Sequence, residues 1–207
     1  SGYIGFDPTA SSLHVGSLMQ IMNLARLQRS GHRPIAVVGG GTGLIGDPTG
    51  KNKTRPELSH GELLANSTRY KEQASRILDA EVKYNSEWLG KLTFADTVRL
   101  ASQFTVGQMI ERDMFQERIK AGRPIYLHEF LYPLMQGYDS VAMGVDMEVG
   151  GSDQTFNMLA GRALMKSIKH KEKFVLATKL LTDPSGKKMG KTEGNMISLD
   201  DDPAAMY

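Results

Sequence analysis

Residues 14–17, HisValGlySer, stand where a helix is predicted to begin. The first turn of a helix carries unpaired backbone N–H groups and the positive end of the helix dipole, and both attract a phosphate. The imidazole of His14 adds a further hydrogen-bonding group at the same place. Because a lone histidine is more often structural, the segment indicates a phosphate site only together with a second motif.

A cluster of cations lies near the other end of the sequence, where residues 187–192 are LysLysMetGlyLysThr. The surrounding stretch, 182–195, is rich in Gly, Lys, Ser and Thr without an apolar period, which predicts a mobile polar loop. Loops of this kind often carry function, and lysines on them can stabilise charge that develops on a phosphate. A lysine pair in a loop is also common as plain solvated surface.

Residues 41–46 fit the pattern G-x-G-x-x-G after a predicted strand, which is typical of dinucleotide-binding oxidoreductases. Asp47 and Pro48 follow at once, where that motif needs a continuing helix. A P-loop also fails, because Ile45 stands at the first glycine position and Asn52 replaces the Ser or Thr. What remains is either a simple turn or a glycine segment that allows close approach of a ligand, with Asp47 at the carboxyl end of a strand.

A third set of polar residues falls on a predicted helix over 127–143. Tyr132, Gln136 and Asp139 are spaced i, i+4 and i+7, so they share one helix face and can converge on a single small ligand. The alternative is a helix that pairs its own polar side chains. Pro133 is unfavourable inside a helix, so we expect the helix to begin near it or to kink there.

The elements that must position these groups alternate between strand and helix patterns, which predicts an α/β domain with a parallel sheet. We predict strands at 2–7, 33–40, 147–149 and 173–181, and helices at 15–29, from Ser59 to about Ala80, and at 93–103, 105–121, 127–143 and 153–168. A further helix begins near Pro203. We find no internal repeat and no linker that would divide two domains.

Composition sets broad limits on the class of protein. The chain has 207 residues, 40% of them hydrophobic, which suits one folded domain. No stretch has the length and apolarity of a membrane span, and the N-terminus lacks the pattern of a signal peptide. Cysteine is absent and the net charge is only +2, so disulfide frameworks are excluded, a cytoplasmic location is favoured and nucleic-acid binding is not indicated by charge alone.

Taken together, the segments 14–17 and 187–192 resemble the HIGH and KMSKS signatures of class I aminoacyl-tRNA synthetases. Within that class the resemblance narrows to the tyrosyl-tRNA synthetase family of bacterial type and covers nearly the whole chain. The segments that carry it are GlyPheAspProThrAla (5–10), GlyLeuIleGlyAspPro (43–48), GlnGlyTyrAsp (136–139) and GlyGlySerAspGln (150–154).

The resemblance implies a Rossmann-like class I synthetase nucleotide-binding fold, with a parallel sheet and a helical insertion at about 84–145. Residues 1–207 would form one catalytic domain, and the C-terminal tRNA-binding domain of the family is expected to be absent. The implied activity joins L-tyrosine to AMP with ATP and Mg²⁺ and then transfers the tyrosyl group to tRNA(Tyr). The family also implies a homodimer through the helical region, and no membrane partner.

The implied tyrosine-binding residues are Tyr3, Asp47, Tyr132, Gln136, Asp139 and Gln154. Tyr3 and Asp139 would contact the phenol, and the others would surround the ammonium. Phenylalanine would leave the first two unpaired, which is a large penalty for buried polar groups. This pair is therefore expected to select tyrosine.

The implied ATP-binding residues are Gly5, Asp7, Gly16, Asp153, Leu180 and Leu181, and the implied catalytic residues are Thr9, His14, Ser17, Lys51, Arg55, Lys188, Lys191 and Thr192. The tyrosine carboxylate is already an anion and needs no general base, so these residues would act by positioning and by stabilising charge on the phosphates. We expect no protein-held metal.

Two positions depart from the family pattern. Ser17 stands where the second histidine of HIGH is usual, and ThrPhe at 155–156 replaces an aromatic residue followed by glycine. Three alternatives to a tyrosine enzyme remain: a tryptophanyl-tRNA synthetase, an inactive RNA-binding relative, and a dinucleotide-binding oxidoreductase that uses residues 41–46.

Overall fold

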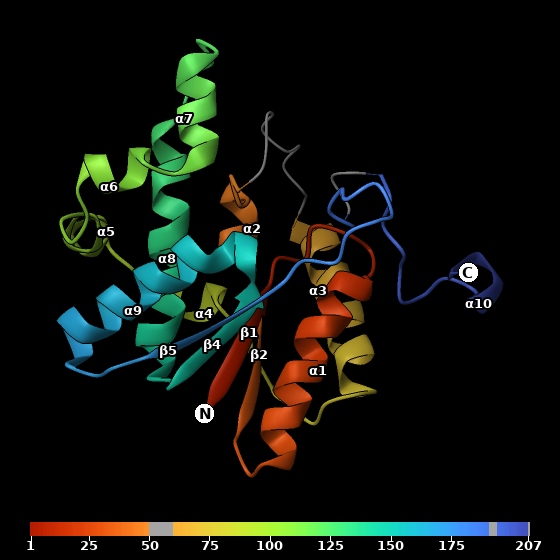
Figure 1. Ribbon diagram of the computed structural model, residues 1–207. Coiled ribbons are helices and arrows are strands. Elements are labelled where there is room, and N and C mark those ends of the chain that lie inside the picture. Colours follow the sequence, from red (N-terminus) through yellow and green to blue (C-terminus); the bar gives the residue numbers. More distant parts are fainter. Residues whose placement is uncertain (50–59, 191–193, 207) are drawn as a thin grey trace.

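The computed structural model describes residues 1–49, 60–190 and 194–206, which form a parallel β-sheet with helices on both faces (Figure 1). The strands are β1 (Gly2–Phe6), β2 (Pro34–Val38), β3 (Glu81–Tyr84), β4 (Met147–Gly151) and β5 (Phe174–Thr178). Their order is β3-β2-β1-β4-β5, and every neighbouring pair is parallel. The predicted α/β class is thus confirmed.

The strand order creates a topological switch point. From β1 the chain builds outward to β2 and β3 on one side, and it later returns to β4 and β5 on the other. Open α/β sheets bind ligands in the crevice outside the carboxyl ends of their strands at such a point. The segments that leave β1 and β4, which begin at Asp7 and Ser152, are therefore the expected walls of a site.

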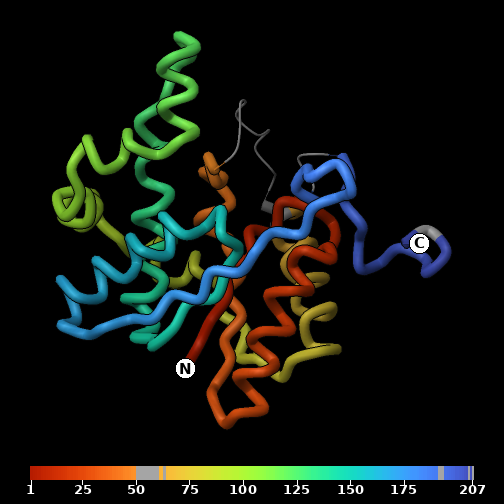
Figure 2. The backbone as a smooth tube through the Cα atoms, in the orientation of Figure 1, coloured from red at the N-terminus to blue at the C-terminus, as the bar shows by residue number. Residues whose placement is uncertain are grey.

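Different helices cover the two faces of β1. Ile4 packs in a buried cluster with α1 (Val15–Arg29) and α3 (His60–Ser75), whereas Tyr3 faces the opposite side together with Val145. Figure 2 shows α1 and α3 side by side on one side of the sheet, with α8 (Leu127–Met143) and α9 (Thr155–Lys169) on the other. The alternation of side chains along the strand thus sends Tyr3 toward α8.

The helices with the clearest patterns agree with the predictions. Both α1 and α8 have the predicted bounds, and α9 differs by two residues at its start and one at its end. The remaining helices of the stretch before α8 are α4 (Ser86–Leu89), α5 (Phe94–Ala101), α6 (Val106–Ile110) and α7 (Asp113–Lys120). Together with α8 they form the whole connection from β3 to β4 within the described chain.

The prediction of one helix over 105–121 is wrong, because α6 ends at Ile110 and α7 begins at Asp113. Between them Arg112 takes an extended conformation with ψ 131°, and its side chain is 8% exposed. Because the helix is interrupted here, the guanidinium of Arg112 is buried in the protein. An apolar period cannot reveal this, because the reason for the break lies in contacts with distant residues.

Strand β3 was not predicted, and α3 ends at Ser75, not near Ala80. The strand sequence GluValLysTyr carries two charged residues and is only partly buried, as suits an edge strand that pairs on one side, with β2. Strand β5 is also shorter than predicted, covering Phe174–Thr178 and not 173–181.

The glycine segment after β2 forms only a short helix, α2 (Thr42–Ile45), which ends at Gly46 with φ 76°. A dinucleotide fingerprint requires a long helix whose N-terminus faces the pyrophosphate. The oxidoreductase alternative therefore finds no support in the fold.

Pro133 lies inside α8, six residues after its first residue, so the helix does not begin near this proline. The other alternative, a kink at Pro133, stays a prediction. The helix ends at Gly144, whose left-handed φ of 63° closes the last turn. A short 3-10 helix, η1 (Ser152–Gln154), joins β4 to α9, and α10 (Pro203–Met206) confirms the predicted helix near Pro203. In the described ranges, no helix has the length and apolarity to cross a membrane.

Candidate active site

A cavity of about 360 Å³ opens at the carboxyl ends of β1 and β4, at the switch point of the sheet. Its size is that of a small-molecule site. Of the predicted site residues within the described ranges, those that line it are Gly5, Asp7, Thr9, His14, Gly16, Ser17, Asp47, Tyr132, Gln136, Asp139, Asp153, Gln154, Leu180, Leu181 and Lys188. Segments far apart in the sequence therefore converge on one space.

Tyr3 is the predicted site residue that does not line this cavity. Its side chain is 0% exposed, and its hydroxyl lies 2.9 Å from Ser140 Oγ, the neighbour of Asp139 on α8. Burial raises the pKa of Tyr3 well above its usual value, and the nearby carboxylates of Glu148 and Asp139 act in the same direction. Tyr3 is therefore a neutral hydroxyl enclosed behind the cavity wall.

Asp139 closes one end of the cavity. Trp88 Nε1 donates to its Oδ1 at 2.8 Å and Asn85 Nδ2 donates to its Oδ2 at 3.3 Å. Burial raises the pKa of Asp139 well above its usual value, although these two hydrogen bonds favour the charged form. A carboxyl in this state can accept from, or share a proton with, a ligand hydroxyl.

The predicted helix face of α8 is present. Tyr132, Gln136 and Asp139 all line the cavity, as the spacing implied. The Tyr132 hydroxyl donates to Asp7 Oδ2 at 2.7 Å, and burial together with the charge of Asp7 raises the pKa of Tyr132 well above its usual value. Gln136 Nε2 donates to Glu148 Oε1 at 3.0 Å, so these groups bond to other elements and not to one another.

Asp47 also lines the cavity and accepts hydrogen bonds from two neighbours. Gln154 Nε2 donates to its Oδ2 at 2.6 Å, and the backbone N–H of Thr49 donates to its Oδ1 at 2.9 Å. Asn157 Nδ2 in turn donates to Gln154 Oε1 at 2.9 Å. The amide of Gln154 is thus oriented from both ends, with its N–H toward Asp47.

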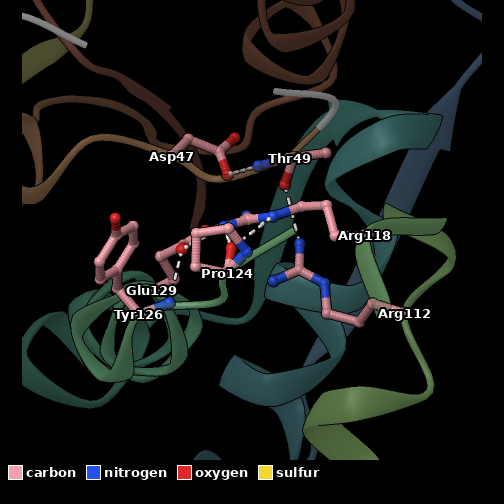
Figure 3. A network of polar contacts seen from close by, with 7 residues as sticks. All are labelled: Asp47, Thr49, Arg112, Arg118, Pro124, Tyr126 and Glu129. Carbon is pink, nitrogen blue, oxygen red and sulfur yellow. Dashed lines mark hydrogen bonds and ion pairs between the residues drawn. The ribbon is translucent and has the colours of Figure 1, made fainter. Parts of the chain in front are cut away.

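The helical segment between β3 and β4 braces this wall (Figure 3). Arg112 Nη2 donates to Thr49 Oγ1 at 2.8 Å, and its guanidinium lies 4.6 Å from the ring centroid of Phe156. Figure 3 shows Arg112 reaching toward the Asp47–Thr49 turn. The departure from the family pattern at Phe156 therefore provides an aromatic face for this cation.

A second arginine, Arg118, joins helices α7 and α8 within the same helical segment. Arg118 from α7 makes two hydrogen bonds to Glu129, from Nη1 to Oε2 at 2.5 Å and from Nη2 to Oε1 at 2.8 Å. Glu129 also accepts from the backbone N–H of Tyr126 at 2.9 Å and so caps the start of α8. Both carboxylate and guanidinium are nearly enclosed, so this pair joins α7 to α8 firmly.

The phosphate motif at 14–17 has the expected helix-start geometry. His14 is the N-cap of α1, and its Nδ1 accepts from the backbone N–H of Gly16 at 3.0 Å. Acceptance at Nδ1 assigns the proton of the neutral ring to Nε2, which makes Nε2 a donor. A Cβ at position 16 would lie 2.7 Å from the His14 ring, so only glycine allows this packing.

The described part of the predicted lysine loop also contributes to the cavity, which Lys188, Met189 and Gly190 line. Lys188 forms an ion pair with Asp153, the carboxylate predicted to bind a ribose. Asp183 holds the turn before it, accepting from Ser185 and from the backbone N–H of Lys187 at 3.0 Å. Lys51, Arg55, Lys191 and Thr192, the other predicted phosphate-binding residues, lie outside the described residues.

Several residues of the site were not predicted: Asn85, Trp88, Arg112, Glu148, Asn157 and Lys173. Asn85, Trp88, Glu148 and Asn157 each form a hydrogen bond with a predicted site residue, whereas Arg112 contacts the turn that follows Asp47 and Lys173 pairs with Glu148. Arg112 and Lys173 are buried cations, which is rare for these residue types, but burial is not visible in a sequence.

No group of three or more His, Cys, Asp or Glu residues in the described ranges could hold a metal ion.

The parallel sheet and the cavity at its switch point define an α/β protein with a candidate ligand site at the carboxyl ends of its strands. A family model described as tRNA synthetases class I (W and Y) matches residues 1–207. The chain therefore belongs to the class I tRNA synthetases, in the group of the tryptophan and tyrosine enzymes.

Similar proteins narrow the comparison. A tyrosine–tRNA ligase of Nitratidesulfovibrio vulgaris is 49% identical over 207 residues, which is 98% of this chain and 52% of that protein. A tyrosine–tRNA ligase of Moorella thermoacetica is 47% identical over 208 residues, covering 99% of this chain and 50% of that protein. The chain thus spans about half the length of the curated relatives it matches. The predicted resemblance to tyrosyl-tRNA synthetases is confirmed.

Solved structures support the fold. A C-terminally truncated mitochondrial tyrosyl-tRNA synthetase of Aspergillus nidulans has a TM-score of 0.80 at 27% identity, covering 94% of this chain and 64% of that one. The Rossmann-like class I fold predicted from the sequence is confirmed by this similarity.

Proposed function

We propose that this chain is a catalytic domain that activates L-tyrosine with ATP to tyrosyl-adenylate and pyrophosphate, and that the tyrosyl group then passes to tRNA(Tyr). The observation that carries the proposal is the cavity at the switch point, which most of the predicted site residues line. Its lining combines the buried carboxyl of Asp139, the carboxylates of Asp47 and Asp7, the helix start at His14 and Gly16, and Lys188.

Tyrosine is proposed to lie along α8. The phenol would reach Asp139, and the ammonium would lie between Asp47, the Tyr132 hydroxyl and Gln136, with Gln154 holding Asp47 in place. Acceptor oxygens at this end suit an ammonium, which offers three donors and no acceptor. Tyr3 is enclosed behind Ser140, so it can contact the phenol only if neighbouring side chains move.

ATP is proposed to lie over the carboxyl ends of β1 and β4. The residues proposed to contact it are Gly5, Asp7, Gly16, Asp153, Leu180 and Leu181, all of which line the cavity. Asp153 would exchange its ion pair with Lys188 for a ribose hydroxyl. That exchange would leave the Lys188 ammonium available to the phosphates.

The reaction is attack of the tyrosine carboxylate on the α-phosphate, with pyrophosphate as leaving group. Because the nucleophile is already an anion, the side chains act by positioning and by charge stabilisation. Thr9, the Nε2–H of His14, Ser17 and Lys188 are proposed to bond the phosphates, together with Lys51, Arg55, Lys191 and Thr192. Lysines on a loop can tighten as charge develops, which raises the rate more than the affinity.

Magnesium is proposed to enter with ATP, since Mg²⁺ keeps several waters and is commonly bound through substrate phosphates. It would neutralise charge on the leaving pyrophosphate. We further propose that the active protein is a cytoplasmic homodimer and that its RNA partner is tRNA(Tyr).

Amino-acid-dependent exchange of pyrophosphate into ATP tests the proposal with the chain as it stands. We expect exchange with L-tyrosine and none above background with L-tryptophan or L-phenylalanine. Exchange driven by tryptophan would favour the tryptophan enzyme. Saturable tRNA binding without exchange for any amino acid would favour an inactive RNA-binding relative, and either result would overturn the proposal.

A further inference from the structure

A buried ion pair has no part in the mechanism above, although its carboxylate, Glu148, is one of the residues that line the cavity. Glu148 of β4 and Lys173, the residue before β5, have side chains that are 2% and 0% exposed. Burying two charges costs several kcal/mol of desolvation per ion, so such a pair is weak as a means of stabilising a fold. A role in specifying geometry is a better reason for its presence.

The protein is built around the Lys173 ammonium. Its Nζ donates to Glu148 Oε2, to Ser140 Oγ at 2.7 Å and to the carbonyl oxygen of Met158 at 3.2 Å, which uses all three of its protons. Gly161 provides the space, because a Cβ there would lie 2.5 Å from Nζ. Although burial lowers the pKa of Lys173, the adjacent Glu148 charge opposes that shift.

Glu148 contacts a second residue of the cavity lining, Gln136. Glu148 bonds Lys173 with Oε2 and accepts from Gln136 Nε2 at 3.0 Å with Oε1. A carboxylate can only accept, so it fixes which end of the Gln136 amide faces it. The N–H₂ end must lie toward Glu148, and the carbonyl oxygen is the end left for a ligand in the cavity that Gln136 lines.

We propose that Glu148, held in place by Lys173, is a positioning residue that fixes the Gln136 amide with its carbonyl oxygen toward the cavity and so selects a ligand with a primary ammonium. The inference rests on the proposed function, since the ammonium is that of tyrosine. In the Glu148→Gln variant, the amide oxygen must face Lys173, because an ammonium can only donate, and the amide N–H₂ is left to face Gln136. The Gln136 carbonyl oxygen would then turn toward residue 148 and away from the ligand. Discrimination for the amino group would then fall.

Two ligands that differ only in the amino group provide the test. We measure by calorimetry, on the full chain, the binding of L-tyrosine and of 3-(4-hydroxyphenyl)propionate. Glu148→Gln should weaken tyrosine about 10- to 100-fold, the range expected for one charge-assisted hydrogen bond, and change the desamino ligand by less than about twofold. Glu81→Gln, which alters an exposed Glu–Lys pair on β3, is the matched control and should change neither.

A double-mutant cycle separates positioning from a simple field effect. If Glu148 acts through Gln136, Glu148→Gln should cost little further tyrosine affinity in a Gln136→Met background. Additive losses would mean that the Glu148 charge attracts the ammonium directly, and the proposal would be overturned. Equal weakening of both ligands would also overturn it, because a general change of the fold does not distinguish them.

Lys173 is tested in the same assay. Lys173→Met should weaken the binding of tyrosine and leave the binding of the desamino ligand nearly unchanged. Thermal unfolding checks that this variant folds. If it does not fold, the result for Glu148→Gln decides whether the inference holds. Failure of the proposed function is a separate result, because the unaltered chain would then not bind tyrosine at all. If the unaltered chain binds tyrosine and Glu148→Gln leaves its affinity unchanged, only the present inference fails.

Discussion

Asp139 is a carboxyl group at 3% exposure whose two hydrogen-bond donors, Trp88 and Asn85, come from a different part of the chain. Burial raises its pKa well above the usual value. A raised pKa means that the folded state binds the proton more tightly than the unfolded state. At the scale of the residue, the Asp139 carboxyl that suits a phenol therefore lowers the stability of the folded state near neutral pH, where the unfolded state would have it ionised.

Replacing Asp139 with asparagine should make this cost measurable. The folded pKa is raised, so the stability from the protonated carboxyl is present at low pH and is lost as pH rises through that pKa. An asparagine side chain does not titrate, so the Asp139→Asn variant should gain on the unaltered chain by roughly 1–2 kcal/mol, or about 2–8 °C in Tm, between about pH 4 and pH 8.

Thermal unfolding across this pH range checks the prediction. The exposed Asp79→Asn change serves as control and should give a constant difference in Tm. The same Asp139→Asn protein should lose tyrosine affinity. A difference in Tm between the variant and the unaltered chain that shrinks as pH rises would contradict the assigned direction of the shift.

At the scale of the element, the lysine loop is organised by one side chain. The Asp183 carboxylate accepts from Ser185, from the Lys187 backbone and from Asn195 Nδ2 at 3.0 Å. The Ser185 hydrogen bond, with Asn195 next, lowers the pKa of Asp183 to about 2. Asn195 also donates to the carbonyl oxygen of Lys188 at 3.1 Å, so the turn and the lysine are linked.

Asp183→Asn should loosen the loop at neutral pH. The folded pKa is depressed, so the stabilising effect of the carboxylate is present above the unfolded pKa and is lost as pH falls toward about 2. An amide N–H₂ in its place would meet the Asn195 N–H₂. We expect pyrophosphate exchange to fall about three- to tenfold with little change in tyrosine binding, and Asp200→Asn to leave both unchanged.

Kinetics at saturating tyrosine and ATP, with tyrosine binding measured separately, distinguish the outcomes. If tyrosine affinity falls in parallel with the exchange rate, the loop does not act on the phosphates alone. An unchanged exchange rate would show that Asp183 does not position Lys188.

At the scale of the whole molecule, the helices between β3 and β4 both brace the Asp47 turn and present apolar side chains outward. Phe94 and Leu127 are 85% and 83% exposed, and Val98 and Val106 are also exposed. Isolated exposed apolar residues are normal, but six large exposed hydrophobic residues within residues 94–127 favour a contact with another protein surface. The proposed homodimer provides such a contact.

A paired change of Phe94→Asp and Leu127→Asp should therefore shift the protein from dimer to monomer, because a carboxylate buried in an apolar interface is strongly unfavourable. Light scattering coupled to gel filtration measures the mass. Leu44→Asp, which alters an exposed residue of α2, is the control and should leave the mass unchanged. A monomeric unaltered chain at micromolar concentration would refute the assignment of this surface.

The sequence by itself determined the features set by near neighbours along the chain. Helices α1 and α8 follow from their apolar period, the buried strands β1 and β2 from short apolar runs, and the Tyr132–Gln136–Asp139 face from helical spacing. The resemblance to known signatures also predicted that the motifs at 14–17 and 187–192 serve one site, and His14, Gly16, Ser17 and Lys188 do line one cavity.

Only the tertiary structure shows which distant residues contact the residues of the site. It enclosed Tyr3 behind Ser140, 137 residues away in sequence, and it placed Lys173 against Glu148 beneath Gln136. It also made a polar segment into β3, which is a strand only because β2 lies beside it. Periodicity is a property of adjacent residues, whereas burial and hydrogen-bond partners depend on which distant elements pack together, and no local pattern records that choice.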